Sequence, residues 1–139
     1  MARFRPALAI VLALLAPAAL AAREQPVAIK DPLTIPVLVK TTDVQLRKAV
    51  RAALLNRGWK LDNEKPGALE AAYRRNDARH DFSARVAVTY DAQQIVVRYL
   101  SSEGLSYDAT ARTILPAYNG WMDMLTKDFP VYLSLVTSN

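Results

Sequence analysis

The spacing of apolar residues changes twice along this chain, and these changes constrain its fold more than any other feature. In residues 43–57, apolar side chains recur at every third or fourth position, which is typical of an amphipathic helix. In residues 59–99 they recur at every second position, which predicts antiparallel strands with one buried face. Helical spacing returns in residues 116–129. This order predicts a two-layer α+β fold, in which a meander of three to four antiparallel strands carries an N-terminal and a C-terminal helix on one face.

Both predicted helices have signals at their starts. Thr41 or Thr42 can cap the first helix, and Gly58 supplies its C-terminal stop. Pro116 can open the last helix, because its fixed φ suits a first turn. Alternatively, a helix that begins earlier, at a cap formed by Asp108, kinks at Pro116.

A second proline, Pro130, interrupts the helical pattern near the C-terminus. Proline lacks the backbone N–H that a helix interior needs, so we expect Pro130 to end or bend the last helix. Residues 131–136 are then either a final strand or a packed tail, and the sequence does not decide between the two.

The alternation also predicts the registers of two hairpins, since a slip of one residue would turn every apolar side chain to water. Loops at residues 76–79 and 91–94 keep the apolar residues on one face. The pairs expected across the hairpins are Tyr73 with Phe82 and Val88 with Val97. On the other face, the pairs expected are Glu70 with Arg85 and Arg74 with Asp81. Such opposite charges contribute about 0.2–1 kcal/mol per pair and neutralise most arginines of this open face.

The N-terminus has the composition of a secretory signal peptide. Arg3 and Arg5 precede an apolar run at residues 7–16, and small residues follow it up to Ala22. We expect cleavage of residues 1–22, which lowers the formal net charge from +5 to +3. An uncleaved anchor is the alternative, but spanning a bilayer takes ~20 apolar residues. Because the chain has no Cys to accept a lipid, we expect a periplasmic protein that is not lipid-anchored.

The segment at residues 23–41 contains Pro26, Pro32 and Pro36 between short β-branched runs. Proline cannot donate to a strand ladder, so we expect this segment to be an extended linker, or at best an edge strand. Residues 42–139 are expected to form a single α+β domain.

Five short motifs are spaced along residues 57–125. They are R-G-W at 57–59, P-G at 66–67, Y-D at 90–91, Y-x-x-S-x-x-L-x-Y at 99–107 and I-x-x-x-Y-N-x-W-x-x-x-L at 114–125. In this pattern the chain resembles a group of small, uncharacterised exported proteins and lipoproteins of Gram-negative bacteria. The resemblance implies an envelope location and an α+β fold, and it implies no activity. This chain differs from that group in lacking the acceptor Cys and in having Leu115 where members often have His.

Aromatic and polar residues concentrate between the last predicted strand and the C-terminal helix. They are Tyr99, Ser102, Tyr107, Tyr118, Asn119 and Trp121. Tyr and Trp combine a large apolar body with a polar tip, so this set can line a binding groove. The alternative is that the aromatic residues belong to the core, with their polar atoms hydrogen-bonded to loop backbone. We expect Ser102 and Asn119 to brace the loop at residues 101–106.

Conventional catalytic sites are not expected. Without Cys, thiolate chemistry and thiolate metal sites are excluded, and His80 is the one imidazole of the chain. His80 lies beside Arg79 and Asp81 at a predicted strand start, where we expect a structural role. The serines lack a nucleophile-elbow glycine pattern, and the four glycines form no phosphate-binding loop. We therefore expect no enzyme activity, no metal and no cofactor.

These observations favour an exported, non-catalytic envelope protein that binds a protein or a surface component through the open face of its sheet or its tyrosine-rich edge. The alternative is a binder of a small molecule or a peptidoglycan fragment, with a pocket lined by Tyr99, Tyr107 and Trp121. Nucleic acid is not an expected partner, because the exported chain has no basic stripe. We expect at most a weak, salt-dependent contact with anionic surfaces through the cationic side of the first helix. Its residues are Arg47, Lys48 and Arg51.

Overall fold

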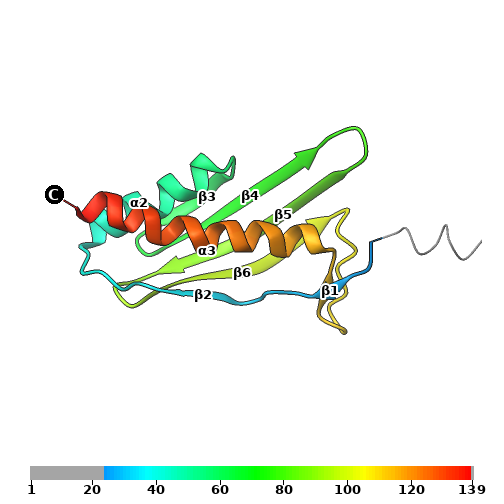
Figure 1. The fold of residues 1–139 in the computed structure, drawn as a ribbon, viewed down its shortest axis with the longest axis horizontal. Helices are drawn as coiled ribbons and strands as arrows, with labels where there is room; N and C mark the ends of the chain where they lie inside the picture. Colours follow the sequence, from blue (N-terminus) through cyan, green and yellow to red (C-terminus); the bar gives the residue numbers. More distant parts are fainter. Residues whose placement is uncertain (1–23, 139) are drawn as a thin grey trace, which may run out of the picture.

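The computed structural model describes residues 24–138, so the expected signal peptide lies outside the described residues. Within them, two helices lie on one face of a twisted antiparallel sheet (Figure 1). The elements in chain order are β1 (Val27–Ala28), β2 (Leu33–Pro36), α2 (Asp43–Asn56), β3 (Lys60–Lys65), β4 (Ala68–Asn76), β5 (Asp81–Tyr90), β6 (Gln94–Glu103), β7 (Thr113–Ile114) and α3 (Pro116–Thr137).

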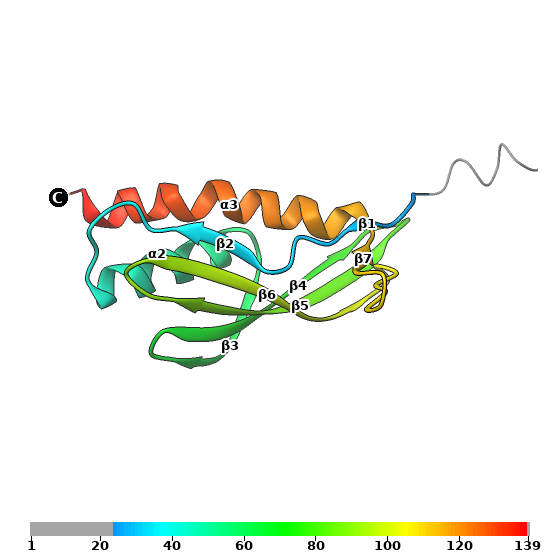
Figure 2. The same cartoon turned by 90° about the horizontal axis from the view of Figure 1, so that it is seen from below.

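The main sheet has five strands in the order β2-β6-β5-β4-β3. Viewed from below, both helices lie on the same side of this sheet, and its other face is open (Figure 2). The predicted two-layer α+β fold is therefore confirmed, and its main sheet has five strands where three to four were expected. The core lies between the layers, where Val86, Val97, Leu125 and Phe129 are fully buried.

The additional strand comes from residues 23–41, which were expected to be a linker or an edge strand. Strand β2 pairs with β6, and its Ile35 is buried opposite Ile95. Pro36 is tolerated there because an edge strand pairs on one side only. The edge strand is therefore the alternative that the structure shows. Strand β1, from the same segment, pairs with β7.

One of the two predicted hairpin registers is confirmed, and the other is shifted. Val88 lies opposite Val97, as expected for the β5–β6 hairpin. In the β4–β5 hairpin, Tyr73 lies opposite Ala84 instead of Phe82. A shift of two residues leaves every side chain on its predicted face, so the apolar alternation cannot distinguish the two registers.

The turn between β4 and β5 explains the shift. The Asp77 carboxylate accepts hydrogen bonds from the backbone N–H groups of Arg79 (2.8 Å) and His80 (2.9 Å). The backbone N–H of Asp77 also donates to the carbonyl of His80 (2.9 Å). These bonds close a turn at residues 77–80 in place of the loop expected at 76–79, because Asp readily bonds to backbone two or three residues further on.

Helix α2 begins with a capping box. The Thr42 hydroxyl accepts from the Gln45 N–H (3.1 Å), and the Gln45 side chain accepts from the Thr42 N–H (2.9 Å). Two backbone donors that the helix itself leaves free are thereby satisfied. Gly58 follows the end of the helix with a φ of +93°, the left-handed conformation that favours glycine. Both predicted ends of this helix are confirmed.

Helix α3 begins at Pro116, as one of the two alternatives predicted, but it continues through Pro130 to Thr137. Residues 131–136, which were expected to form a strand or a packed tail, are helical instead. An interior proline costs ~3 kcal/mol or more. Packing of the following turns offsets this cost, since Leu133 is buried and a fully buried leucine contributes about 1.5–3 kcal/mol. The Gln45 side chain also donates to the Val136 carbonyl (3.4 Å).

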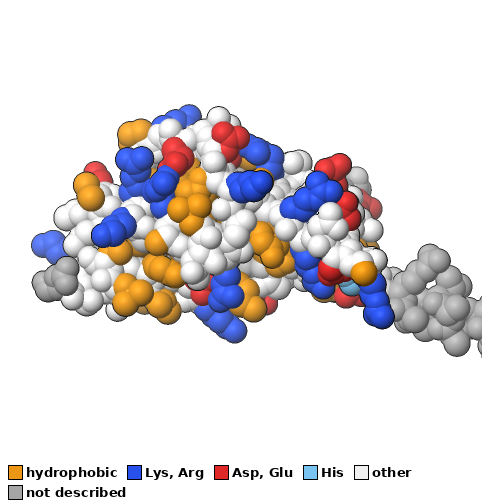
Figure 3. All heavy atoms as spheres, turned by 90° about the horizontal axis from the view of Figure 1, so that it is seen from above, with side chains coloured by type: hydrophobic (Ala, Val, Ile, Leu, Met, Phe, Trp, Pro, Cys, Tyr) orange, Lys and Arg blue, Asp and Glu red, His pale blue; other side chains and the backbone are white. Residues whose placement is uncertain are grey.

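The surface on the α2 side carries both basic and apolar side chains. In the view from above, Lys and Arg side chains are interspersed with hydrophobic ones (Figure 3). Among the described residues, no helix combines the length and the apolar character of a membrane-spanning segment.

Candidate functional site

Six aromatic side chains contact one another in a continuous series from β6, across α3, to β4 and the start of β3. The ring centroids are 4.1 Å apart for Tyr99 and Tyr107, 5.7 Å for Tyr99 and Tyr118, 6.5 Å for Tyr118 and Trp121, 4.8 Å for Trp121 and Tyr73, and 5.3 Å for Tyr73 and Trp59. The four aromatic residues singled out in the sequence thus come together between β6 and α3. They join two others, Trp59 of the R-G-W motif and Tyr73, which was expected on the apolar face of the sheet.

Tyr118 divides this series into two ends. Its side chain is completely buried, and it lies between the Tyr99–Tyr107 pair and Trp121. Burial raises the pKa of its phenol well above the ordinary value. Its hydroxyl has no hydrogen-bond partner among the described residues. Tyr99 and Tyr107 therefore lie at one end and Trp121 at the other, with a core residue between them.

At the first end, Tyr99 is held by polar contacts. Its hydroxyl is 2.7 Å from the Ser102 Oγ, and its backbone N–H donates to the Asp31 carboxylate (3.0 Å). Burial raises the pKa of the Tyr99 phenol, although the Ser102 hydrogen bond opposes this shift. Tyr107 stacks on the Tyr99 ring with an angle of 28° between the planes. Tyr99 and Tyr107 are therefore partly buried, and these contacts hold the Tyr99 ring in place.

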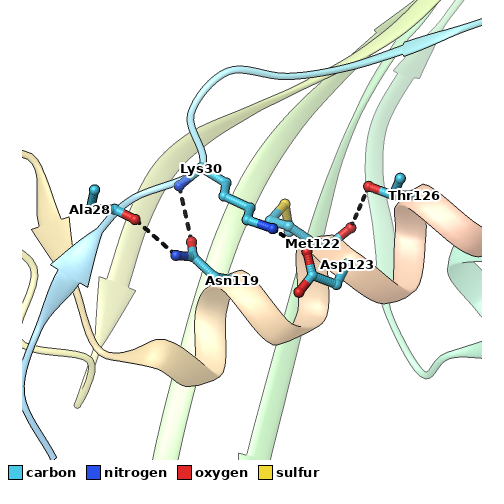
Figure 4. Close-up of polar contacts among 6 residues, drawn as sticks. All are labelled: Ala28, Lys30, Asn119, Met122, Asp123 and Thr126. Carbon is cyan, nitrogen blue, oxygen red and sulfur yellow. Dashed lines mark hydrogen bonds and ion pairs between the residues drawn. The ribbon is translucent and has the colours of Figure 1, made fainter.

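Asn119 binds the N-terminal segment instead of the loop at residues 101–106, so that expectation is wrong. Its Nδ2 donates to the Ala28 carbonyl (2.8 Å), and its Oδ1 accepts from the Lys30 N–H (3.0 Å) (Figure 4). The Lys30 ammonium also pairs with Asp123 one turn further along α3. A single amide can satisfy a backbone donor and a backbone acceptor at once. Asn119 therefore fastens the chain beside β1 to α3.

At the second end, Trp121 borders a surface groove of about 410 Å³. This aromatic groove is lined by Asn56, Arg57, Trp59, Tyr73, Arg75, Trp121 and Met124. Trp121 meets both Tyr73 and Trp59 edge to face, at interplanar angles of 71° and 89°. Edge-to-face pairs are worth about 0.5–1.5 kcal/mol beyond the area they bury, so these rings hold one another in place.

Two arginines stand at the aromatic groove, and each has an acidic partner. Arg57 binds the Asp128 carboxylate through Nε (2.6 Å) and a terminal nitrogen (3.2 Å), and this hydrogen bonding raises the pKa of its guanidinium. Arg75 binds Asp77 (3.2 Å) and lies 6.0 Å from the centre of the Phe82 ring. The first pair orients a guanidinium fork, because two parallel bonds fix its plane.

The sequence did not indicate that Arg57, Trp59, Tyr73 and Arg75 belong to one site. A signal was present in the motifs, since R-G-W at residues 57–59 and the motif at 114–125 both contribute to the groove. Only the fold shows that they meet, because α2 ends beside the first half of α3. The Arg57–Asp128 ion pair joins the end of α2 to the middle of α3.

The open face of the sheet is the second concave surface. A hollow of about 670 Å³ lies over β3 to β6, lined largely by small and charged side chains such as Ala72, Ser83 and Arg85. Arg85 binds Glu70 (2.7 Å) and Asp62 (3.0 Å), which lowers the pKa of both carboxyls. Its charge is therefore met by its own neighbours.

Arg74 and Asp81 form a further ion pair (2.7 Å) across the β4–β5 hairpin. Both ion pairs that the sequence predicted on the open face therefore form, although the shifted register makes their partners diagonal neighbours.

The lining of the aromatic groove combines aromatic rings with guanidinium and amide groups. It contains no carboxylate, imidazole, hydroxyl of serine, or thiol. Within residues 24–138, no group of three or more His, Asp and Glu side chains is arranged to hold a metal ion. His80 is not among the residues that line the aromatic groove. Its Nδ1 lies 3.3 Å from the Asp77 carboxylate, and its ring centroid lies 4.8 Å from that of Phe82.

Comparisons with known proteins add no function: no protein-family model matches the chain, and no curated protein matches it either.

Proposed function

We propose that this chain is a non-catalytic binding module of the bacterial cell envelope, which contacts a protein partner through the aromatic groove. One observation carries the proposal. Apart from Asn56, every side chain lining the groove is Trp, Tyr, Arg or Met. These residue types are enriched at protein interfaces, and Trp, Tyr and Arg dominate their binding energy.

The groove also has the rigidity that an interface needs. Its rings contact one another, and Arg57 is fixed by two hydrogen bonds to Asp128. Side chains that are already ordered lose little conformational entropy on binding, so more of the contact energy becomes affinity. The envelope location rests on the signal-peptide composition and on the resemblance of the motifs.

A second candidate function is the binding of a small molecule or a peptidoglycan fragment in the same groove. Its volume of about 410 Å³ falls in the range of small-molecule sites, about 300–1,000 Å³. The Asn56 amide and the arginines supply hydrogen-bond donors beside the apolar ring faces.

Site-specific photocrosslinking tests the first function. A photoreactive amino acid replaces Met124, which is 41% exposed at the groove, in the full chain expressed in intact cells. We expect a discrete crosslinked protein that disappears in the Arg75→Glu variant and persists when Arg98, on the open face, is changed to Glu. Crosslinks that are equally strong from position 98 and from position 124 would contradict a partner at the groove.

Tryptophan fluorescence separates the two functions. The chain contains two tryptophans, Trp59 and Trp121, and both line the groove. A saturable fluorescence change on titration with purified muropeptides, lost in Arg75→Glu, would favour the small-molecule function. A flat titration together with a specific crosslinked protein would favour the first.

A further inference from the structure

The helices α2 and α3 pack side by side, and their outer surface meets the aromatic groove only at Met124. The helices run antiparallel, because Gln45 at the start of α2 reaches Val136 at the end of α3, and Arg57 after α2 reaches Asp128 near its middle. Their outward sides therefore lie next to each other, as Figures 1 and 2 show from two directions.

The outward side of this layer exposes apolar residues on both helices. They are Val44 (76% exposed) and Leu55 (50%) on α2, and Met124 (41%), Val131 (55%) and Leu135 (62%) on α3. On α2, the spacing of four, three and four residues places Val44, Lys48, Arg51 and Leu55 along one line opposite the buried side. We call the combined surface of these residues, Arg47 and Lys127 the helical face.

Three of the four cations that we assign to the helical face form no ion pair with an acidic side chain of the described residues. Among the described residues, Arg47, Lys48 and Lys127 form no ion pair, whereas Arg51 pairs with Glu64. The acidic residues of α3 are already engaged, since Asp123 pairs with Lys30 and Asp128 with Arg57. The helical face thus combines unmatched positive charge with exposed apolar side chains.

We infer that the helical face binds the surface of an anionic phospholipid bilayer. Lys and Arg side chains meet the headgroups, and the exposed apolar side chains enter the interface. The complementarity of charge selects this occupant over a second copy of the chain. A twofold contact through this face would bring the unmatched cations of both copies together, which like-charge repulsion opposes. The inference does not depend on a partner in the aromatic groove.

Vesicle sedimentation tests this inference. The chain from residue 23 onward is used, because its core is built from residues 29–133 and the apolar run at 7–16 would itself bind lipid. We expect it to sediment with vesicles of phosphatidylcholine and phosphatidylglycerol at about 50 mM salt, and much less at about 500 mM, where screening is stronger. Pure phosphatidylcholine vesicles should bind it at least about tenfold more weakly.

Two double variants and a matched control locate the contact. The Lys48→Glu, Lys127→Glu variant should lose about tenfold or more in vesicle binding, since each headgroup contact contributes about fivefold. The Leu55→Ser, Val131→Ser variant should lose several-fold. The control is Lys60→Glu, Arg98→Glu on the open face, which makes the same charge change and should bind within about twofold of the unchanged chain.

Three results would overturn the inference. They are an absence of binding to phosphatidylglycerol vesicles at low salt, an equal loss of binding in the open-face control, and a dimer in solution that the Leu55→Ser, Val131→Ser variant abolishes. The four residues changed on the helical face are all exposed, so their substitution should leave the core intact. Circular dichroism should confirm that the variants fold. If one variant fails to fold, the salt dependence of vesicle binding and the other double variant still show whether the helical face binds the bilayer.

Discussion

Replacing Tyr118 with Phe should stabilise this protein, although it removes a polar group from the centre of the candidate site. The Tyr118 hydroxyl is completely buried and has no partner among the described residues. Burying a hydroxyl without a hydrogen bond costs about 1–3 kcal/mol in protein mutational data. Phenylalanine keeps the ring contacts with Tyr99 and Trp121, so the transfer cost is removed and little packing is lost. We therefore expect the free energy of unfolding to rise by about 1 kcal/mol or more.

Urea titration followed by tryptophan fluorescence and by circular dichroism measures this change. The matched control is Tyr99→Phe, which removes the hydroxyl that contacts Ser102 at 2.7 Å. This variant should be less stable by about 0.5–1.5 kcal/mol, the usual net worth of one hydrogen bond. A loss of stability in Tyr118→Phe as large as in the control would refute the reasoning, because it would show that the Tyr118 hydroxyl is hydrogen-bonded in the folded protein.

Three further predictions test the arrangement around this site. Stability should fall as the pH rises above about 10, since burial raises the pKa of Tyr118 and the unfolded chain loses this proton first; urea titrations at increasing pH should show a smaller fall in Tyr118→Phe. Asn119→Ala should lower the free energy of unfolding by about 1–2 kcal/mol, because two backbone groups beside β1 lose their partner; unchanged hydrogen exchange of the Lys30 amide would contradict this. Pro130→Ala should raise it by at least about 1 kcal/mol, since a helix interior regains its hydrogen bond; an equal or lower urea midpoint would show that α3 depends on the proline ring.

The sequence predicted the layers of the fold because periodicity reports directly on which face of an element is buried. The switch from helical spacing to alternation located α2, the strands and α3, and residues with known local chemistry located the helix ends. The capping box of Thr42 and Gln45 and the first turn at Pro116 are examples. These features depend on a few neighbouring residues, so they can be read without knowing the rest of the molecule.

Errors arose where a long-range contact outweighed a local preference. Pro130 was expected to end or bend the last helix and to be followed by a strand or a packed tail, yet the helix continues to Thr137, with Leu133 buried in the core. Asn119 reads as a brace for the nearest loop, yet its partners Ala28 and Lys30 are about ninety positions away in the chain. Neither outcome is visible in a local pattern, because each depends on which segment the fold places alongside.

The candidate site illustrates the same limit. Tyr99, Tyr107, Tyr118 and Trp121 could be grouped from their positions near the C-terminal helix, and their rings do contact one another. The aromatic groove could not be predicted, because it also needs Arg57 and Tyr73, which come from the end of α2 and from β4. Alternation assigns Tyr73 to the buried face of the sheet. It does not show where the helices stop covering this face and leave Tyr73 at the surface.

Met124 belongs to both surfaces for which we propose a role. It lines the aromatic groove and is one of the exposed apolar residues of the helical face. A chain bound to a bilayer through the helical face would therefore hold the groove at the edge of the lipid surface, while the open face of the sheet points away from it (Figure 2). A membrane-associated partner would then meet the groove at a raised local concentration, so even a weak contact at Trp121 and Arg75 could be occupied. If both proposals hold, the helical-face variants should weaken the Met124 crosslink in cells, whereas Arg75→Glu should leave vesicle binding nearly unchanged.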